Sequence, residues 1–268
     1  TAPVLSTVED NGLFFRTAPS DARSAEVLAE ILIEQGYKSA AITYVNNDYG
    51  KGLGSAIETN FVAGGGTVTI NAGHEENKGD YSADAAALAQ AGGDILVVAG
   101  YADGGGGAII QGSLDLGSFE TFFLPDGMYA DSLTATFGSQ IDGSFGASAG
   151  TDSPGDATFK TLFAKAGHEY NVYAGEYYDA AALIMLAMQA ANSSSSSDLK
   201  DHVMDVANAP GEKIYPGELA KGLKILADGG KIDYVGASAV ELIGPGESGG
   251  AYLQYEVQNG KFATVGYR

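Results

Sequence analysis

The chain has 268 residues and a formal net charge of −20, from 34 acidic and 14 basic side chains. Such an acidic surface repels phosphate backbones and anionic lipid, which argues against nucleic-acid binding and membrane-surface binding. The absence of cysteine excludes disulfides, thiolate metal sites and cysteine nucleophiles. Hydrophobic residues make up 45% of the chain, a share that permits a packed core.

The sequence offers no motif for a metal or a membrane helix. The three histidines, His74, His168 and His202, are far apart in the sequence, and we expect them at the surface. No apolar run reaches the roughly 18–20 residues of a membrane helix. The segment 1–3 lacks the basic start and apolar core of a signal peptide, although a removed signal peptide would leave no trace. We therefore expect no cofactor and no membrane insertion.

Helical and strand patterns alternate along residues 17–146. Ala25, Leu28 and Leu32 recur at helical spacing, which predicts a helix that ends at Gly36. This alternation, with short loops, predicts an α/β fold in which helices flank a parallel sheet. The other predicted helices are 49–61, 81–90 and 108–116, and the predicted strands are 39–45, 67–71, 94–99 and 121–124.

The pattern becomes more helical over residues 150–250. The segment 174–191 is apolar on most of its sides, which predicts a buried helix. Asn259-Gly260 is a strong hairpin-turn dipeptide, so we expect a hairpin of strands 250–258 and 261–265. The other predicted helices in this part are 156–165, 198–207 and 218–227.

Tyrosines and carboxylates follow three of the predicted strands. Residues 46–50, 100–103 and 125–129 come directly after strands, and ligands of open parallel sheets bind at such carboxyl ends. Tyrosine offers a flat apolar wall with a hydroxyl, and a carboxylate pairs with an ammonium. The pattern therefore predicts a site for a small amine or amino acid.

Several other polar residues have two interpretations. Asp48 fits a helix N-cap better than a ligand contact. The glycine run 104–107 lacks the Lys-Ser/Thr of a phosphate-binding loop, which favours a turn. Arg16 holds either a hinge carboxylate or an anion, and Asp179 is either a paired polar group or a lobe–lobe or ligand contact.

An ordered set of short segments resembles a known family, the ABC-transporter solute-binding proteins of the branched-chain amino acid (Leu/Ile/Val) type, with the type I periplasmic binding fold. No single segment is specific, but their order runs along nearly the whole chain. The segments are Thr1-Ala2-Pro3, Phe15-Arg16-Thr17-Ala18, Asn47-Asp48-Tyr49-Gly50-Lys51-Gly52, Gly100-Tyr101, Pro125-Asp126-Gly127 and Tyr177 with Asp179-Ala180-Ala181.

The resemblance implies a two-lobed α/β fold with parallel sheets and three inter-lobe crossovers, near residues 14–18, 146–150 and 250–254. It also implies that most of the first lobe lies outside this chain, so that a missing segment or a second chain would complete it and helices such as 174–191 would keep an uncovered apolar face. The implied parts are 1–16 at the end of a first-lobe segment, 17–146 as the second lobe, 150–250 as the helical remainder of the first lobe, and 254–268 as a return to the second.

The resemblance also assigns the ligand site. It implies that Tyr49 and Tyr101 form walls, that Asp126 pairs with the ligand ammonium, and that Thr1 matches a threonine of the carboxylate site. Leucine-binding members commonly have Glu where this chain has Asp126, and the shorter side chain argues against strict branched-chain specificity.

The implied function is extracytoplasmic capture of a small amino acid, or a related amine or amide, by lobe closure. The protein would be secreted to the periplasm or the cell exterior and would deliver its ligand to the membrane subunits of an ABC importer. The alternative is a ligand-sensing domain of a signalling or regulatory protein with the same fold. An enzyme is disfavoured, because the sequence has no G-x-S-x-G elbow, P-loop or convincing dinucleotide-binding glycine motif.

Overall fold

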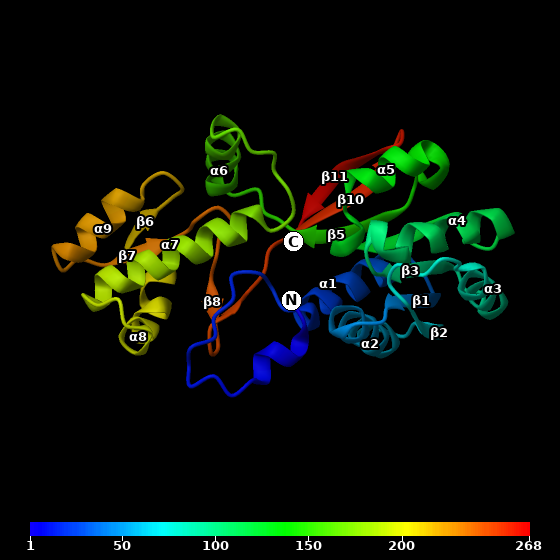
Figure 1. Ribbon diagram of the computed structural model, residues 1–268, viewed down its shortest axis with the longest axis horizontal. Helices are drawn as coiled ribbons and strands as arrows, with labels where there is room; N and C mark the ends of the chain where they lie inside the picture. Colours follow the sequence, from blue (N-terminus) through cyan, green and yellow to red (C-terminus); the bar gives the residue numbers. More distant parts are fainter.

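The computed structural model describes residues 1–268 and contains a seven-stranded sheet, which lies in the right-hand half of Figure 1. The order is β11-β10-β5-β4-β3-β1-β2; the first five strands of the chain run parallel, and the β10–β11 hairpin adds an antiparallel edge. The strands are β1 (Ser39–Val45), β2 (Thr67–His74), β3 (Ile95–Ala99), β4 (Phe122–Pro125), β5 (Phe145–Ala149), β10 (Tyr252–Gln258) and β11 (Lys261–Tyr267).

Helices cover both faces of this sheet because its central strands are apolar on both sides. In β1, Ala40 and Ile42 pack into one core with the first two helices, whereas Ala41 points into the opposite core. Helices α1 (Asp21–Glu34) and α2 (Asp48–Ala63) cover the first face, and α3 (Ser82–Ala91), α4 (Gly107–Leu116) and α5 (Asp131–Phe137) cover the second. We call these elements, with the sheet, the sheet unit.

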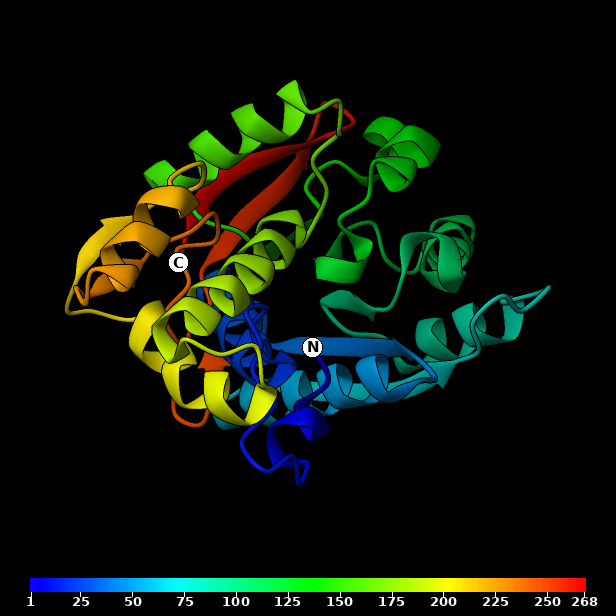
Figure 2. The ribbon, with the colours of Figure 1, turned by 60° about the vertical axis from the view of Figure 1, so that its left-hand side comes forward.

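A second unit, the helical unit, is built mainly from helices and has its own core. Figure 2 turns it toward the viewer, with α7 running through it and contacting both α8 and α9. Its elements are α6 (Pro154–Lys165), α7 (Ala174–Ala191), α8 (Ser196–Ala207), α9 (Leu219–Ala227), the parallel pair β6 (Glu212–Ile214) and β7 (Ile232–Tyr234), and the hairpin of β8 (Leu242–Ile243) and β9 (Glu247–Ser248).

One buried carboxylate organises this helical unit. Asp179 on α7 is fully buried and accepts hydrogen bonds from the Tyr234 hydroxyl at 2.8 Å and from the Ala237 and Ser238 backbone amides at 2.7 Å each. The Ser238 hydroxyl donates a further bond at 2.7 Å. The interpretation of Asp179 as a paired polar group is therefore confirmed.

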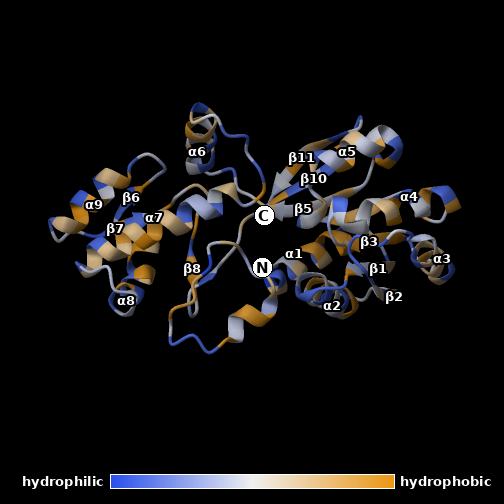
Figure 3. Ribbon diagram, viewed as in Figure 1, coloured by the Kyte–Doolittle hydropathy of each residue, from blue (hydrophilic) through white to orange (hydrophobic).

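Helix α7 is buried on one face only. Leu183 and Leu186 lie in the core of the helical unit, but Tyr177, Ile184 and Met185 are 77%, 51% and 42% exposed. Figure 3 shows the apolar colouring along this helix. This exposed stripe corrects the prediction of a buried helix and agrees with the uncovered apolar face that the resemblance implied, because α8 and α9 contact only part of the helix.

Three segments pass between the two units: residues 14–19, whose Phe15 packs against the core of the helical unit, residues 150–153, and residues 246–251, which include β9. We call these segments the three connections. The first and third lie side by side, since the Arg16 amide donates to the Gly246 carbonyl at 3.0 Å and Pro19 bridges to Ser248. The second joins the third through a 3.0 Å bond from the Gly150 amide to the Ala251 carbonyl. None of the helices combines the length and apolarity that crossing a membrane requires.

Two local predictions need correction. Asn47, not Asp48, caps α2: its Oδ1 accepts from the Gly50 amide at 2.9 Å, while Asp48 lies in the first turn. His74 is buried rather than at the surface, because it lies at the end of β2 with Thr43 Oγ1 2.9 Å from its Nδ1 and the Tyr81 ring packed edge-on.

Candidate ligand-binding site

A cleft of about 1280 Å³ lies between the sheet unit and the helical unit. Its sheet side is formed by the loops after β1, β3 and β4, as expected for carboxyl ends of parallel strands, and also by α5 and the β10–β11 hairpin. Thr1, Tyr49, Tyr101 and Asp126, the four predicted site residues, all line this cleft. On the helical side the lining residues include Lys160, Tyr170 and Tyr173.

Two tyrosines form a stacked pair on the sheet side. The rings of Tyr49 and Tyr101 have centroids 5.2 Å apart and planes inclined by 19°. Gly127 lies against both rings: a Cβ there would come within 2.9 Å of the Tyr49 hydroxyl and 2.3 Å of the Gly100 carbonyl oxygen. The absence of a side chain at Gly127 therefore lets the β4 loop pack closely against the pair, whose near-parallel rings form a flat aromatic wall.

Asp126 joins the two sides of the cleft. Its Oδ1 accepts a 3.0 Å hydrogen bond from the Tyr49 hydroxyl, and its Oδ2 accepts a 2.8 Å bond from the Tyr173 hydroxyl. Burial raises the pKa of both tyrosines well above its ordinary value, and the Asp126 charge adds to this effect, so both hydroxyls stay protonated donors. Each carboxylate oxygen keeps a further lone-pair direction for a ligand donor.

Tyr173 also lines the cleft, and the sequence prediction missed it. It precedes α7 with φ +69°, a left-handed conformation that is uncommon for a residue with a side chain. Such strain occurs often at functional sites. It is 47 residues from Asp126 in sequence, and no motif around it marks it as a partner of the β4 loop.

A second carboxylate lies behind the cleft wall. Asp21, at the start of α1, is 1% exposed and accepts a 2.9 Å hydrogen bond from the Thr1 hydroxyl. Burial, with a contribution from the charge of Asp126, raises the pKa of the Asp21 carboxyl to about 6. Asp21 therefore fixes the orientation of Thr1, whereas Asp126 faces the cleft.

The far part of the cleft is aromatic and also has two lysines, Lys160 and Lys261, in its lining. Lys160 on α6 lies 4.6 Å above the Tyr170 ring and pairs with Asp156 at 2.8 Å. Tyr129 packs on Tyr255, with ring centroids 4.4 Å apart. A ligand in this cleft therefore meets a carboxylate at one end and aromatic faces along its length.

The remaining polar candidates lie outside the cleft. The glycine run 104–107 forms a turn and the start of α4, and Gly105 has φ +110° with the Tyr81 ring packed against it. Asp48 and Asp179 do not line the cleft. No group of three or more His, Asp or Glu side chains is arranged to hold a metal ion.

Comparison of the sequence with protein families gives a match to the family described as periplasmic binding protein, over residues 3–211. This range covers well over half of the chain. The chain belongs to the periplasmic binding protein family. No curated protein matches the sequence.

Solved structures agree with this assignment. A leucine-binding protein from Thermotoga maritima superposes with a TM-score of 0.75 at 19% identity, over 94% of this chain and 67% of its own. A Desulfitobacterium hafniense ABC-transporter substrate-binding protein in complex with Leu gives 0.61 at 24% identity, with the same coverages. An R. palustris solute-binding protein in complex with benzoate gives 0.70 at 17% identity, over 94% and 64%.

The predicted fold class is confirmed, since the sheet and its flanking helices match type I periplasmic binding proteins. The family resemblance drawn from the sequence is confirmed as well. This periplasmic binding protein spans about two thirds of the length of those structures. Neither the family nor these structures favours the alternative of a signalling domain.

Proposed function

We propose that this periplasmic binding protein captures a small amino acid or a related amine in the cleft between its two units. The observation that carries the proposal is Asp126, a carboxylate at the cleft surface beside the stacked rings of Tyr49 and Tyr101. An ammonium loses several kcal/mol of solvation on burial unless it is paired, so a carboxylate in the cleft selects amines over alkyl groups of equal shape.

Thr1 would complete the polar end of the site. Its hydroxyl donates to Asp21, which leaves only the oxygen lone pairs as acceptors, so this hydroxyl would face the ligand ammonium rather than the ligand carboxylate that the resemblance implied. The ligand body would lie against the tyrosine wall. Because Asp126 is one methylene shorter than the Glu common in leucine-binding members, the ligand amine would sit closer to the β4 loop.

Capture would proceed by closure of the two units about their three connections. A ligand that contacts both sides binds the closed state better than the open state and shifts the population toward it. The Tyr173–Asp126 bond already spans the cleft, so Tyr173 would move with the helical unit and close over the ligand.

The same proposal includes an extracytoplasmic location and a transporter partner. The protein would act outside the cytoplasm as a carrier rather than an enzyme, and the membrane subunits of an ABC importer would receive its ligand. The related structures were solved with ligands of two kinds, Leu and benzoates. Asp126 supports the amino acid class, because a benzoate carboxylate would meet a like charge there.

Calorimetry with L-leucine, γ-aminobutyrate and benzoate tests the proposal. We expect an amine ligand to bind and Asp126→Ala to weaken its binding by about 2–5 kcal/mol, as for removal of one member of a buried charged pair. Asp131→Ala is the matched control, since Asp131 lines the same cleft and is exposed.

Two results would contradict the assignment. Unchanged affinity in Asp126→Ala would remove this carboxylate from the site. Binding of benzoate with no binding of either amine would leave a solute-binding protein but overturn the amine class.

A further inference from the structure

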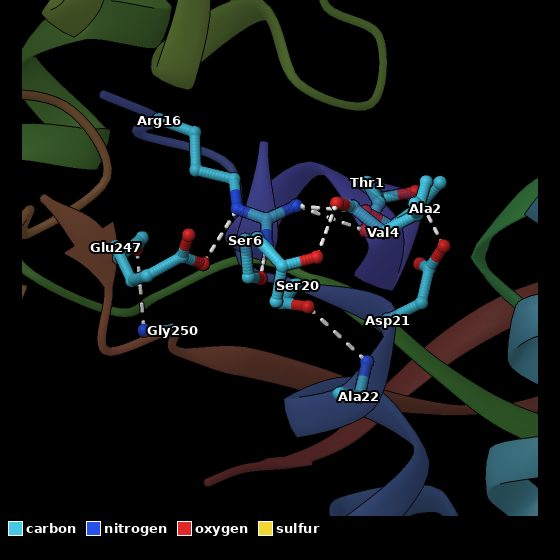
Figure 4. A network of polar contacts seen from close by, with 12 residues as sticks. Thr1, Ala2, Val4, Ser6, Arg16, Ser20, Asp21, Ala22, Glu247 and Gly250 are labelled. Atoms are coloured by element: carbon cyan, nitrogen blue, oxygen red, sulfur yellow. Dashed lines mark hydrogen bonds and ion pairs between the residues drawn. The ribbon is translucent and has the colours of Figure 1, made fainter. Parts of the chain in front are cut away.

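The guanidinium of Arg16 links two of the connections between the units to Thr1, a residue of the cleft lining. Arg16, on the first connection, is 8% exposed, and its Nε donates to Glu247 Oε2 of the third connection at 2.6 Å (Figure 4). One terminal nitrogen donates to the Thr1 and Ala2 carbonyls at 3.1 and 3.2 Å, and the other donates to the Ser6 hydroxyl. The guanidinium of Arg16, on the first connection, is thus bonded to the third connection and to the N-terminal segment 1–6, whose first residue lines the cleft.

The same segment is held from its other side by α1. The Thr1 carbonyl accepts a second hydrogen bond, from the Asp21 amide at 3.0 Å, and the Thr1 hydroxyl donates to the Asp21 carboxylate. Figure 4 shows Arg16 and Asp21 on opposite sides of Thr1. The position of Thr1 at the cleft therefore depends on three bonds, of which Arg16 supplies the one that comes from the connections.

We propose that Arg16 is a positioning residue of the ligand site, which fixes Thr1 relative to the paired first and third connections through its contacts with Thr1, Ala2 and Glu247. This inference rests on the proposed function of the cleft. Arg16 itself does not line the cleft, so it acts through Thr1. When the two units rotate about their connections, Glu247 and Thr1 stay in a fixed relation.

Only arginine supplies this geometry. Its donors diverge in one plane toward a carboxylate, two carbonyls and a hydroxyl. Lysine keeps the charge next to Glu247 but has a single nitrogen, which cannot reach all of these acceptors at once. The conservative variant Arg16→Lys therefore separates the charge of this residue from its clamping of Thr1.

The test measures amide exchange without ligand and affinity with ligand in the full chain. We expect Arg16→Lys to speed exchange of the Asp21 amide at least tenfold relative to the Val97 amide in the sheet core. For whichever of L-leucine or γ-aminobutyrate binds the native protein, we expect at least a tenfold loss of affinity. Arg23→Lys is the matched control, because Arg23 pairs with Glu26 on the exposed face of α1.

The exchange measurement and the affinity measurement distinguish a failure of the amine proposal from a failure of the Arg16 inference. If the native protein binds neither probe, the amine proposal fails, and the exchange ratio alone decides whether Arg16 positions Thr1. An unchanged ratio with unchanged affinity overturns the inference. If Arg16→Lys destabilises the whole protein, Ser6→Ala provides the test, because it removes one contact of the guanidinium. The ratio of the Asp21 to the Val97 amide exchange rate should then still rise about twofold to fivefold. No rise in this ratio overturns the inference.

Discussion

The sheet unit and the helical unit stabilise their interiors in different ways. The sheet unit buries two apolar cores of 18 and 16 residues, one on each face of a continuous sheet. The helical unit has a core of 12 residues, with a fully buried carboxylate beside it and an exposed apolar stripe on α7. The sheet unit therefore has the larger apolar interior, whereas the smaller interior of the helical unit is accompanied by a buried carboxylate, Asp179, that accepts four hydrogen bonds.

The two aspartates Asp126 and Asp179 show what this difference means for function. Asp179 accepts four hydrogen bonds from its own unit, so it has little capacity left for a ligand. Asp126 accepts two, from tyrosines on opposite sides of the cleft, and faces open volume. The number of acceptor positions already used therefore leaves Asp126, but not Asp179, free to accept from a ligand.

The largest expected effect is the loss of the buried carboxylate. Asp179→Ala leaves the Tyr234 hydroxyl and the amides of Ala237 and Ser238 without partners, and we expect about 3–5 kcal/mol less stability. Urea denaturation measures the loss, and amide exchange should place it in α7 and β7.

A carboxylate of the sheet unit provides the matched control. Asp94 accepts from the Lys38 and Ser39 amides at 3.0 and 2.8 Å, but it is exposed. Because water can bond to these amides in Asp94→Ala, the free energy of unfolding should fall by only about 1 kcal/mol. Equal losses in the two variants would contradict the contrast between the units.

A pH-dependent effect of intermediate size comes from Glu176 at the start of α7. Burial raises the pKa of the Glu176 carboxyl to about 7 from the ordinary 4.5. The unfolded chain releases this proton near pH 4.5 and the folded chain near pH 7, so folding loses stability progressively between these values. Glu176→Gln should therefore gain about 2–3 kcal/mol at pH ~8 and almost nothing at pH ~4.

Denaturation at these two pH values measures the difference. Glu169→Gln is the control, because Glu169 is exposed shortly before the same helix. A gain at the higher pH that is equal in both variants would mean that net charge, rather than the buried site, causes the effect.

The sheet unit is also the region that local sequence patterns describe better. Strands such as Ile95–Ala99 are apolar runs between glycines, and the carboxyl-end rule alone places Tyr49, Tyr101 and Asp126 at one edge of the sheet. Their common cleft follows from topology. Their roles as ligand contacts remain a prediction.

The helical unit and its side of the cleft are less predictable. The strands β6 to β9 have two or three residues each, which is too short for a period-2 pattern. Tyr173 reaches Asp126 only because the chain returns across the cleft, and its left-handed φ has no sequence signal. Contacts between units of a fold depend on tertiary geometry that local patterns do not contain.

The smallest expected effect concerns the bond that joins the two regions. Tyr173→Phe removes the 2.8 Å hydrogen bond to Asp126 and keeps the ring, and we expect the ligand-free closed state to lose about 1 kcal/mol, or roughly fivefold in population. Because the chain has no cysteine, Asp103→Cys and Glu169→Cys give clean sites for spin labels on the two units. Tyr177→Phe, on an exposed tyrosine of α7, is the control. A longer interlobe distance in Tyr173→Phe alone would establish this contact as the link between the units, whereas identical distances in both variants would assign closure to the three connections.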